Sequence, residues 1–302
     1  MLARRKLNRV TTGEIIVMIL LAIFSISCLY PFVYFIACSL NTATDTMKGG
    51  LMLWPRDFTL DNYRAAFNNK DIFQAFKISV IITVVGSLST VVLDALAAYA
   101  LTVKKLPFRN GITMFIYAST IFSGGVVPTF ILYRNLGLLN NIMIYFLPGF
   151  YSFFTIVMMR TFMEQLPISL SEAAEIDGAN EIRVFFSVIL PLSMPLIATQ
   201  LLFIAVRLWN EWHIGAFYVS DSKLIPAATF LQKLLKEADM TSNIEALKAQ
   251  GIYVDDQMVV QTVTPDSLRM TFVVIIVTPI LLVYPFLQKY FVKGVMVGAV
   301  KS

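Results

Sequence analysis

The sequence predicts an all-α integral membrane protein with six transmembrane helices, and its composition and apolar windows carry that prediction. Of its 302 residues, 57% are hydrophobic and 14% are charged, whereas soluble domains are about 45–50% apolar and about 25% charged. A spanning helix needs about 20 mostly apolar residues. Six windows meet this length, at 15–37, 76–101, 112–133, 142–162, 192–218 and 268–291.

Several classes of protein are excluded by what the sequence lacks. Cys28 and Cys38 both lie in the first window, about 15 Å apart along a helix, which is too far for a disulfide between them. His213 is the only histidine, so a metal site or catalytic pair built on several imidazoles is excluded. The sequence has no glycine-rich phosphate loop, and the chain is not expected to hydrolyse ATP.

Lysine and arginine set the expected orientation, because basic residues collect on the cytoplasmic side of membrane proteins. With the N-terminus inside, the inner segments hold twelve basic and six acidic residues, and the outer segments hold nine and eleven. The net charge of +5 therefore indicates orientation rather than nucleic-acid binding. The first window contains Pro31 and exceeds the length of a signal-peptide core, so we expect a retained helix and two cytoplasmic termini.

Two long outer loops are expected, over residues 39–75 and 219–267. The first is expected to be irregular and partly packed. In the second, residues 229–238 have apolar side chains at the spacing of a short amphipathic helix. This loop is either a solvated linker or a surface for a binding partner, and its length favours the partner. The whole chain, residues 1–302, is expected to form a single transmembrane domain.

The inner loop between the fourth and fifth windows contains several helix signals. Ser169 and Glu172 have the spacing of a capping box, which predicts a helix that begins at this point. Gly178 fits the left-handed position that follows a helix. Asn180 is expected to cap a second short helix that continues to Phe186.

This helix–turn–helix occupies residues 164–191, and Pro191 is expected to interrupt the chain before the fifth window. Small alanines beside carboxylates leave room for another helix or groove, so contact with another protein is one interpretation. The alternative is an amphipathic hairpin at the lipid headgroups, which the acidic side chains of the loop oppose because the cytoplasmic leaflet is anionic.

The loop also matches a longer pattern, E-A-A-x3-G-x9-[I/V]-x-L-P. The matching residues are Glu172, Ala173, Ala174, Gly178, Val188, Leu190 and Pro191. The pattern resembles the cytoplasmic EAA loop of permease subunits in binding-protein-dependent ABC importers. Further stretches resemble the carbohydrate branch of that family, at 53–67, 96–110 and 135–141. The stretches 122–130 and 284–302 resemble its subgroup for aldouronates and other complex oligosaccharides.

The resemblance implies the type I permease fold, with a cytoplasmic coupling loop that docks on an ATPase. It implies a second homologous permease, two ABC ATPase subunits that bind ATP and magnesium, and an extracytoplasmic binding protein that delivers a sugar, expected to be an oligosaccharide. This chain would hold no cofactor and catalyse no reaction, and it would lie in the cell membrane as a multi-pass protein. The expected ATPase-coupling residues are Glu172, Ala173, Ala174, Asp177, Gly178, Leu190 and Pro191.

Small and polar residues form a stripe on one face of the second window, at helical spacing. They are Ser79, Thr83, Gly86, Ser87, Thr90, Asp94, Ala97 and Ala98. Packing against a neighbouring helix is favoured over lining the pathway. An ionisable group inside a span faces protein or water, so Asp94 is expected to meet a hydroxyl, a backbone group or the partner permease. Arg207 is disfavoured as its partner, because straight helices would leave the two offset by about 10 Å.

The fifth window ends in a run of polar and aromatic residues. Arg207 and Glu211 are four residues apart and are able to pair within one helix. Trp209, Asn210 and Glu211 are candidates for substrate contact, because a sugar has apolar C–H faces and polar hydroxyls. Interface anchoring is the alternative for tryptophan. In the third window, Ser-Gly-Gly at 123–125 and Pro128 are expected to weaken the helix locally, either as a break beside a cavity or as an ordinary kink.

A self-contained secondary transporter or channel is the rival function from a different class. It should show internal repeats and an ion-coupling set within the membrane, for which only Asp94, Arg207 and Glu211 are available. A membrane enzyme would need a convergent acid, base or metal cluster, which the sequence does not show. Copurification with ATPases and a second permease would discriminate these functions.

Overall fold

The structure is a computed structural model that describes residues 12–50, 53–104, 106–122, 124–237 and 266–299, with side chains described as far as residue 283. Regular structure in these ranges is helical, and the one strand-like feature among them is an isolated antiparallel bridge between Asn41 and Phe58. The contacts divide the chain into two compact units. The first is Met1–Asn68 with Glu237–Ile276, and the second is Asn69–Lys236 with Val277–Ser302.

The first unit is held together where its helices meet. It contains α1 (Thr12–Ser39), α2 (Ala43–Thr46), α3 (Asp61–Asn68) and the first turns of α13 (Asp266–Ala299). The segment expected to be irregular thus includes two short helices. The amide Nδ2 of Asn62 donates to the carbonyls of Ser39 and Asn41, at 3.1 and 2.8 Å, and its Oδ1 accepts from the Ser267 hydroxyl at 3.1 Å.

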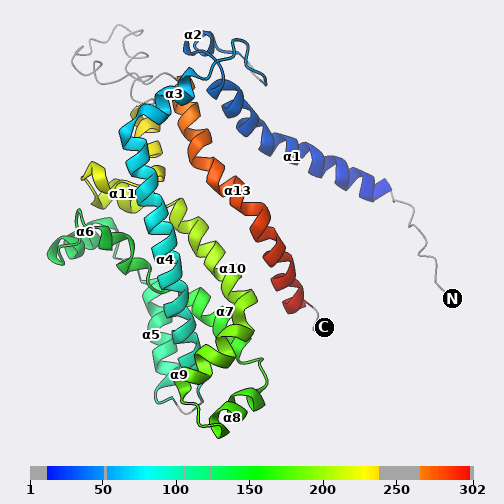
Figure 1. Cartoon of the computed structure of the whole chain (residues 1–302), viewed down its shortest axis with the longest axis vertical. Helices are drawn as coiled ribbons and strands as arrows, with labels where there is room; N and C mark the ends of the chain where they lie inside the picture. Colours follow the sequence, from blue (N-terminus) through cyan, green and yellow to red (C-terminus); the bar gives the residue numbers. More distant parts are fainter. Residues whose placement is uncertain (1–11, 51–52, 105, 123, 238–265, 300–302) are drawn as a thin grey trace. The chain divides into compact units, whose positions relative to one another are not determined.

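The second unit contains most of the remaining helices, and Figure 1 labels its α-helices. In chain order they are α4 (Lys70–Thr102), α5 (Arg109–Ile121), α6 (Val126–Asn135), η1 (Ile142–Tyr145), η2 (Leu147–Gly149), α7 (Phe153–Met163), α8 (Ile168–Ile176), α9 (Glu181–Val184), the π-helix η3 (Phe185–Ile189), α10 (Leu190–Trp209), α11 (His213–Tyr218) and η4 (Ser222–Leu224). Residues 227–237 are also helical, as the amphipathic pattern predicts. The rest of that predicted outer loop, 238–265, lies outside the described residues.

Four helical stretches in the described ranges are long and apolar enough to cross a membrane. They are α1, α4, the stretch Glu181–Tyr218 and the part of α13 to Val283. Two further pairs, α5 with α6 and η1–η2 with α7, are each bent by more than 40° and bring the number to six if each pair is one span. The predicted windows therefore match helices, while the number of six spans stays a prediction.

The third predicted window is broken at its glycines. α5 ends at Ile121, and α6 begins at Val126 after Gly125, whose φ is +79°. Glycine adopts this conformation readily because it has no Cβ. The predicted local weakening of the helix is confirmed, and the suggestion that it lines a cavity stays a prediction.

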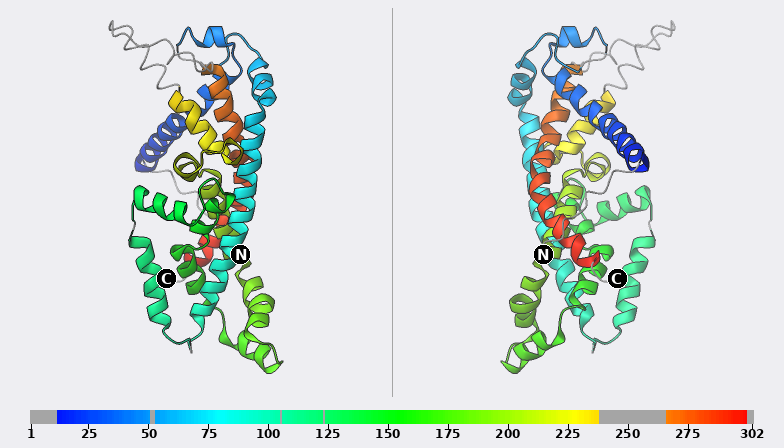
Figure 2. Two further views of the ribbon diagram at one scale, coloured as in Figure 1. Left: turned by 90° about the vertical axis from the view of Figure 1, so that its left-hand side faces the viewer. Right: turned by 90° about the vertical axis from the view of Figure 1, so that its right-hand side faces the viewer.

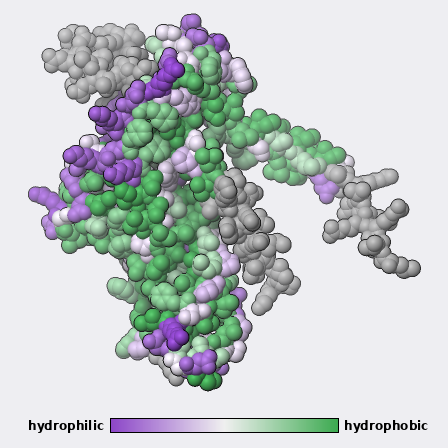
Figure 3. Space-filling view, in the orientation of Figure 1, coloured by the Kyte–Doolittle hydropathy of each residue, from purple (hydrophilic) through white to green (hydrophobic). Residues whose placement is uncertain are grey.

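α4 is the central helix of the second unit and packs against α7 and α10 (Figure 1). The predicted stripe on α4 is buried or half-buried along its whole length. α10 comes close at Gly86, where an added Cβ would lie 2.8 Å from Cδ1 of Leu208. The opposite face of α4 is apolar and exposed, for example at Val85 and Val92. Figure 3 shows hydrophobic residues over much of the visible face of this unit, as expected of a surface that meets lipid or another subunit.

Candidate coupling loop and intramembrane site

The predicted coupling loop is formed by α8 and α9, which project from one end of the second unit (Figure 2). α8 begins at Ile168 with Pro167 at its N-cap, and no side chain caps its first turn. The predicted capping box of Ser169 and Glu172 is therefore wrong, because Ser169 already lies within the first turn. Proline suits the helix start because its φ is fixed and an N–H there would have no helical partner.

Gly178 makes the turn between the two helices, as predicted. Its φ is +82°. Its N–H donates to the carbonyl of Glu175 at 2.9 Å, and the N–H of Ala179 donates to the carbonyl of Ala174 at 2.9 Å. These two bonds form a Schellman motif, which requires a left-handed residue at the glycine position. Two backbone hydrogen bonds thus close the turn.

α9 leads without interruption into α10. Asn180 caps α9 as predicted, since its Oδ1 accepts the N–H of Arg183 at 2.9 Å. The helix then passes through the π-helix η3 into α10, so the predicted end at Phe186 and the predicted interruption at Pro191 are wrong. The wider π turn accommodates a proline, which has no N–H to donate and whose ring crowds the preceding turn.

The predicted coupling residues divide into an exposed and a packed group. Ala174 and Leu190 are half-buried and pack against the core of the unit. The remaining five are exposed, namely Glu172, Ala173, Asp177, Gly178 and Pro191. Each of these exposed residues is accessible to another protein.

Two isoleucines of the same loop are also exposed, although the sequence pattern does not include them among the coupling residues. Ile176 is 86% exposed and Ile182 is 69% exposed. Large apolar side chains on a polar, exposed turn indicate a protein contact. The sequence does hold one indication of Ile176. It lies three residues after Ala173, a spacing that places both residues on the same side of α8.

Asp94 is fully buried within the second unit and bonds to the backbone. Its Oδ1 accepts the N–H of Ser152 at 3.0 Å, while Thr90 donates to the carbonyl of Gly149 at 2.8 Å. These bonds hold the segment between η2 and α7 against α4. The prediction of a backbone partner is confirmed, and the second oxygen, Oδ2, has no hydrogen-bond partner in the described part of the chain. No ion pair joins Asp94 to Arg207, both of which are described residues.

The end of α10 at Trp209 separates Arg207 from Glu211. Glu211 lies beyond the helix, where its Oε1 accepts the N–H of Ile214 at 3.0 Å. The predicted pair of Arg207 and Glu211 is not formed, because the i,i+4 geometry ends with the helix. Asn210 bonds a carbonyl in the last turn of α10 at 2.8 Å. Asn210 therefore stabilises the end of α10 and Glu211 the first turn of α11, and contact of either side chain with substrate stays a prediction.

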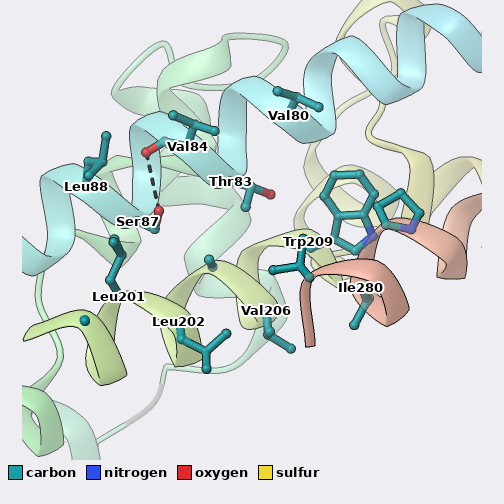
Figure 4. Close-up of a pocket in the computed structure, with 14 residues that line it drawn as sticks. Val80, Thr83, Val84, Ser87, Leu88, Leu201, Leu202, Val206, Trp209 and Ile280 are labelled. Carbon is teal, nitrogen blue, oxygen red and sulfur yellow. Dashed lines mark hydrogen bonds between the residues drawn. The ribbon is translucent and has the colours of Figure 1, made fainter. Parts of the chain in front are cut away.

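Trp209 lines an apolar cleft of about 490 Å³ between α4, α10 and α13. Figure 4 shows Val80 and Thr83 on one wall and Ile280 near the indole. Ser87 donates to a carbonyl of its own helix at 3.4 Å, and the Thr83 hydroxyl has no partner among the described residues. Because sugar hydroxyls need hydrogen-bond partners, this cleft suits apolar groups better than a sugar.

The described geometry is that of a helical protein with helices long and apolar enough to cross a membrane. An exposed helix–turn–helix lies at one end of its second unit. Among the described residues, no three His, Cys, Asp or Glu side chains gather in a way that would hold a metal ion.

Comparison with known proteins supplies the family. Residues 3–297 match the binding-protein-dependent transport system inner membrane component family, and the chain belongs to it. The chain is 34% identical to the polygalacturonan/rhamnogalacturonan transport system permease protein YtcP of Bacillus subtilis, over 93% of this chain and 96% of the relative. It is 35% identical to protein LplC of the same organism, over 90% and 89%.

A solved structure gives the same class of fold. The chain resembles one from the crystal structure of a bacterial ABC transporter involved in the import of the acidic polysaccharide alginate. The TM-score is 0.79 and the identity 26%, over 96% of this chain and 100% of that chain. The prediction of an all-α ABC importer permease is confirmed.

Proposed function

We propose that this chain is the transmembrane subunit of an ATP-driven importer and that it forms the translocation pathway for an oligosaccharide with a second permease. The observation that carries the proposal is the α8–α9 loop, which combines the E-A-A pattern with a bonded Gly178 turn and an exposed surface. Membership of a binding-protein-dependent family supports delivery of the sugar by a binding protein.

In this function, two partner ATPases bind ATP and magnesium, and each closure of the pair moves a docked coupling loop. The α8–α9 loop is suited to transmit that movement because its turn is closed by backbone hydrogen bonds. The hydroxyl of Tyr99 on α4 also donates to Glu181 on α9 at 2.7 Å. Since α9 continues through η3 into α10, movement of the loop reaches a span directly. The loop and both termini lie on the cytoplasmic side.

The substrate class that we propose is an acidic oligosaccharide. The relatives named above include a polygalacturonan permease, and the similar solved transporter takes up alginate. In this chain, Arg207 is exposed in the last turn of α10 and has no ion pair with any described residue. A cation inside a membrane faces protein or water, and a guanidinium pairs strongly with a carboxylate. Arg207 is therefore the residue proposed to meet a uronate.

The test is uptake by proteoliposomes that contain both permeases, the ATPases and the binding protein. We expect ATP-dependent uptake of an oligogalacturonate. Arg207→Gln should reduce it by about tenfold, the loss expected for a charge-assisted hydrogen bond, while uptake of a neutral oligosaccharide by the same assembly changes little. An equal loss of uptake for both sugars would show that Arg207 does not recognise the charge of the substrate. Uptake by the isolated chain under an ion gradient would support the secondary transporter instead.

A further inference from the structure

A cavity of about 730 Å³ lies in the second unit beside the first turns of α8. Its wall includes the last turn of α4, the end of α7 and the first residue of α5. The side chains that matter chemically are Lys104, Arg109, Arg160, Glu164 and Ser171. None of the charged residues in this cavity belongs to the E-A-A pattern.

The cavity has an excess of positive charge. Glu164 accepts from Nε of Arg160 at 3.0 Å and also from Nη2 of Arg109. One carboxylate thus faces two guanidiniums. Lys104 is exposed and has no ion pair or hydrogen bond with the described part of the chain. Three cations and one anion therefore line the same space, which is left net positive.

The two guanidiniums are fixed in place before any ligand arrives. Nε of Arg109 donates to the carbonyl of Leu101 at 2.6 Å, and Nη1 of Arg160 donates to the hydroxyl of Thr113 at 3.5 Å. The side chains of Arg109 and Arg160 are 22% and 21% exposed. A partly buried, prearranged pair binds an anion with less loss of side-chain entropy than two free surface arginines.

We propose that this cavity binds the phosphate of an anionic phospholipid in the cytoplasmic leaflet. The proposal rests on the cytoplasmic placement of α8 in the proposed function. The cavity lies where predicted spans end, which is the depth of the headgroups. Met163, Leu166 and Ile189 share the lining with the basic residues, so apolar wall is available for the lipid next to its charge. Basic pockets between helices on the cytoplasmic side suit anionic headgroups.

The bound lipid would also contact the coupling helix. Ile168 and Ser171 of α8 line the same cavity. A phosphate on Arg109 and Arg160 would neutralise the excess charge behind α8 and fill the space that the helix would otherwise move into. Anionic lipid is therefore expected to favour the docked position of the loop and to raise coupling to the ATPases.

The test measures the lipid directly on the full complex of both permeases and ATPases. The complex is purified in detergent, and the anionic phospholipid that it retains is counted by native mass spectrometry. Loss of each basic side chain should lower retention roughly fivefold near an anionic surface. We therefore expect the complex to retain roughly fivefold less anionic phospholipid with Lys104→Gln, and roughly twenty-five-fold less with Lys104→Gln/Arg160→Gln. Lys104 is exposed and has no ion pair with a described residue, so the single variant should fold normally.

The matched control is Arg134→Gln, which removes an exposed arginine of α6, on the predicted outer side. It should leave retention unchanged. In nanodiscs of phosphatidylcholine, added phosphatidylglycerol should raise the ATPase activity stimulated by loaded binding protein in the wild type and control, but not in the double variant. Glycerol phosphate and inorganic phosphate serve as soluble probes of the same charge.

Three results would overturn the proposal. Equal lipid retention by wild type and double variant would show that the cavity does not bind lipid. Equal stimulation by inorganic phosphate would assign the cavity to a free anion. Loss of copurifying ATPase with unchanged lipid retention would assign the cations to a carboxylate of the ATPase. Lipid retention does not require transport, so failure of the proposed importer function would appear separately, as absent sugar uptake with lipid still bound.

Discussion

The α8–α9 loop and the packed face of α4 obtain their structure in opposite ways. The loop is built from contacts between near neighbours, such as the bonds of Gly178 to Glu175 and of Asn180 to Arg183. The face of α4 is built from distant contacts. Asp94 bonds Ser152, and the Ser79 hydroxyl accepts the N–H of Ala227 at 2.8 Å.

The difference separates a region whose turn is closed by local hydrogen bonds from one whose contacts form only in the folded unit. Local bonds keep the loop in shape while its outer surface remains free to bind a partner. Distant bonds fix α4 against α7 and α10, so a defect there should reduce the stability of the unit before it affects any partner. The following substitutions test this division, from the largest expected effect to the smallest.

The largest effect is expected from Gly215→Ala in α11. A Cβ at this position would overlap Oγ1 of Thr229 and lie 3.0 Å from the hydroxyl of Tyr145. Thr229 is fully buried and donates to the carbonyl of Trp212 at 3.0 Å, so it cannot simply turn away. We expect a loss of about 1–3 kcal/mol from overpacking, measured as a lower unfolding temperature of the purified permease complex.

The matched control is Gly111→Ala in α5, where a Cβ meets nothing within 4 Å. It should keep or slightly raise stability, because alanine favours a helix. Adding Thr229→Ala to Gly215→Ala should restore part of the loss by removing the overlapping hydroxyl. If Gly215→Ala were as stable as wild type, α11 would not pack as closely as the structure shows.

Asp94→Leu is expected to have the second largest effect. Leucine leaves the half-buried N–H of Ser152 without its acceptor, which costs about 1–3 kcal/mol. Asp94→Asn keeps an oxygen at the same place and should lose much less. The measurement is the yield and unfolding temperature of the assembled complex. A fully stable and active Asp94→Leu transporter would contradict a role in holding η2 and α7 against α4.

The same division explains what the sequence could predict. Gly178 and Asn180 were predictable because each acts on residues within a few positions of itself, and their residue types suit few other conformations. The stripe on α4 was predictable from its spacing, although its partner Ser152 was not. The predicted pair of Arg207 and Glu211 was wrong because the end of α10 depends on tertiary packing. The predicted interruption at Pro191 was wrong because a π turn leaves no simple pattern in the sequence.

Gly178→Val tests the loop and should affect coupling more than stability. Its φ of +82° disfavours a β-branched residue, by about 1–2 kcal/mol, but a Cβ would meet nothing within 4 Å. We therefore expect an inserted, assembled protein in which loaded binding protein stimulates the ATPases less. Gly111→Ala again serves as the control. Wild-type stimulation and transport by an assembled Gly178→Val complex would refute the coupling role.

The smallest effect is expected from pH, at Asp45 in the first unit, where local and distant contacts combine. The Asn41 amide donates to Asp45 at 3.0 Å, and Lys48 and Arg56 lie at 3.3 and 2.9 Å. The hydrogen bond from Asn41, followed by those from Lys48 and Arg56, lowers the pKa of Asp45 below its ordinary value of 3.8. Folding therefore gains from the ionised carboxylate at neutral pH.

Because the folded pKa is the lower one, this gain is complete above pH 3.8 and is lost as the pH falls through the folded value. Proteolysis or hydrogen exchange of residues 41–58 should thus accelerate below that pH in the wild type. Asp45→Asn should start with weaker protection at pH 7 and show a smaller acid response. Asp61→Asn, which removes a carboxylate that is 75% exposed, should behave like wild type. If Asp61→Asn showed the same acid response as Asp45→Asn, the net charge of the protein, rather than the contact between Asn41 and Asp45, would determine how protection changes with pH.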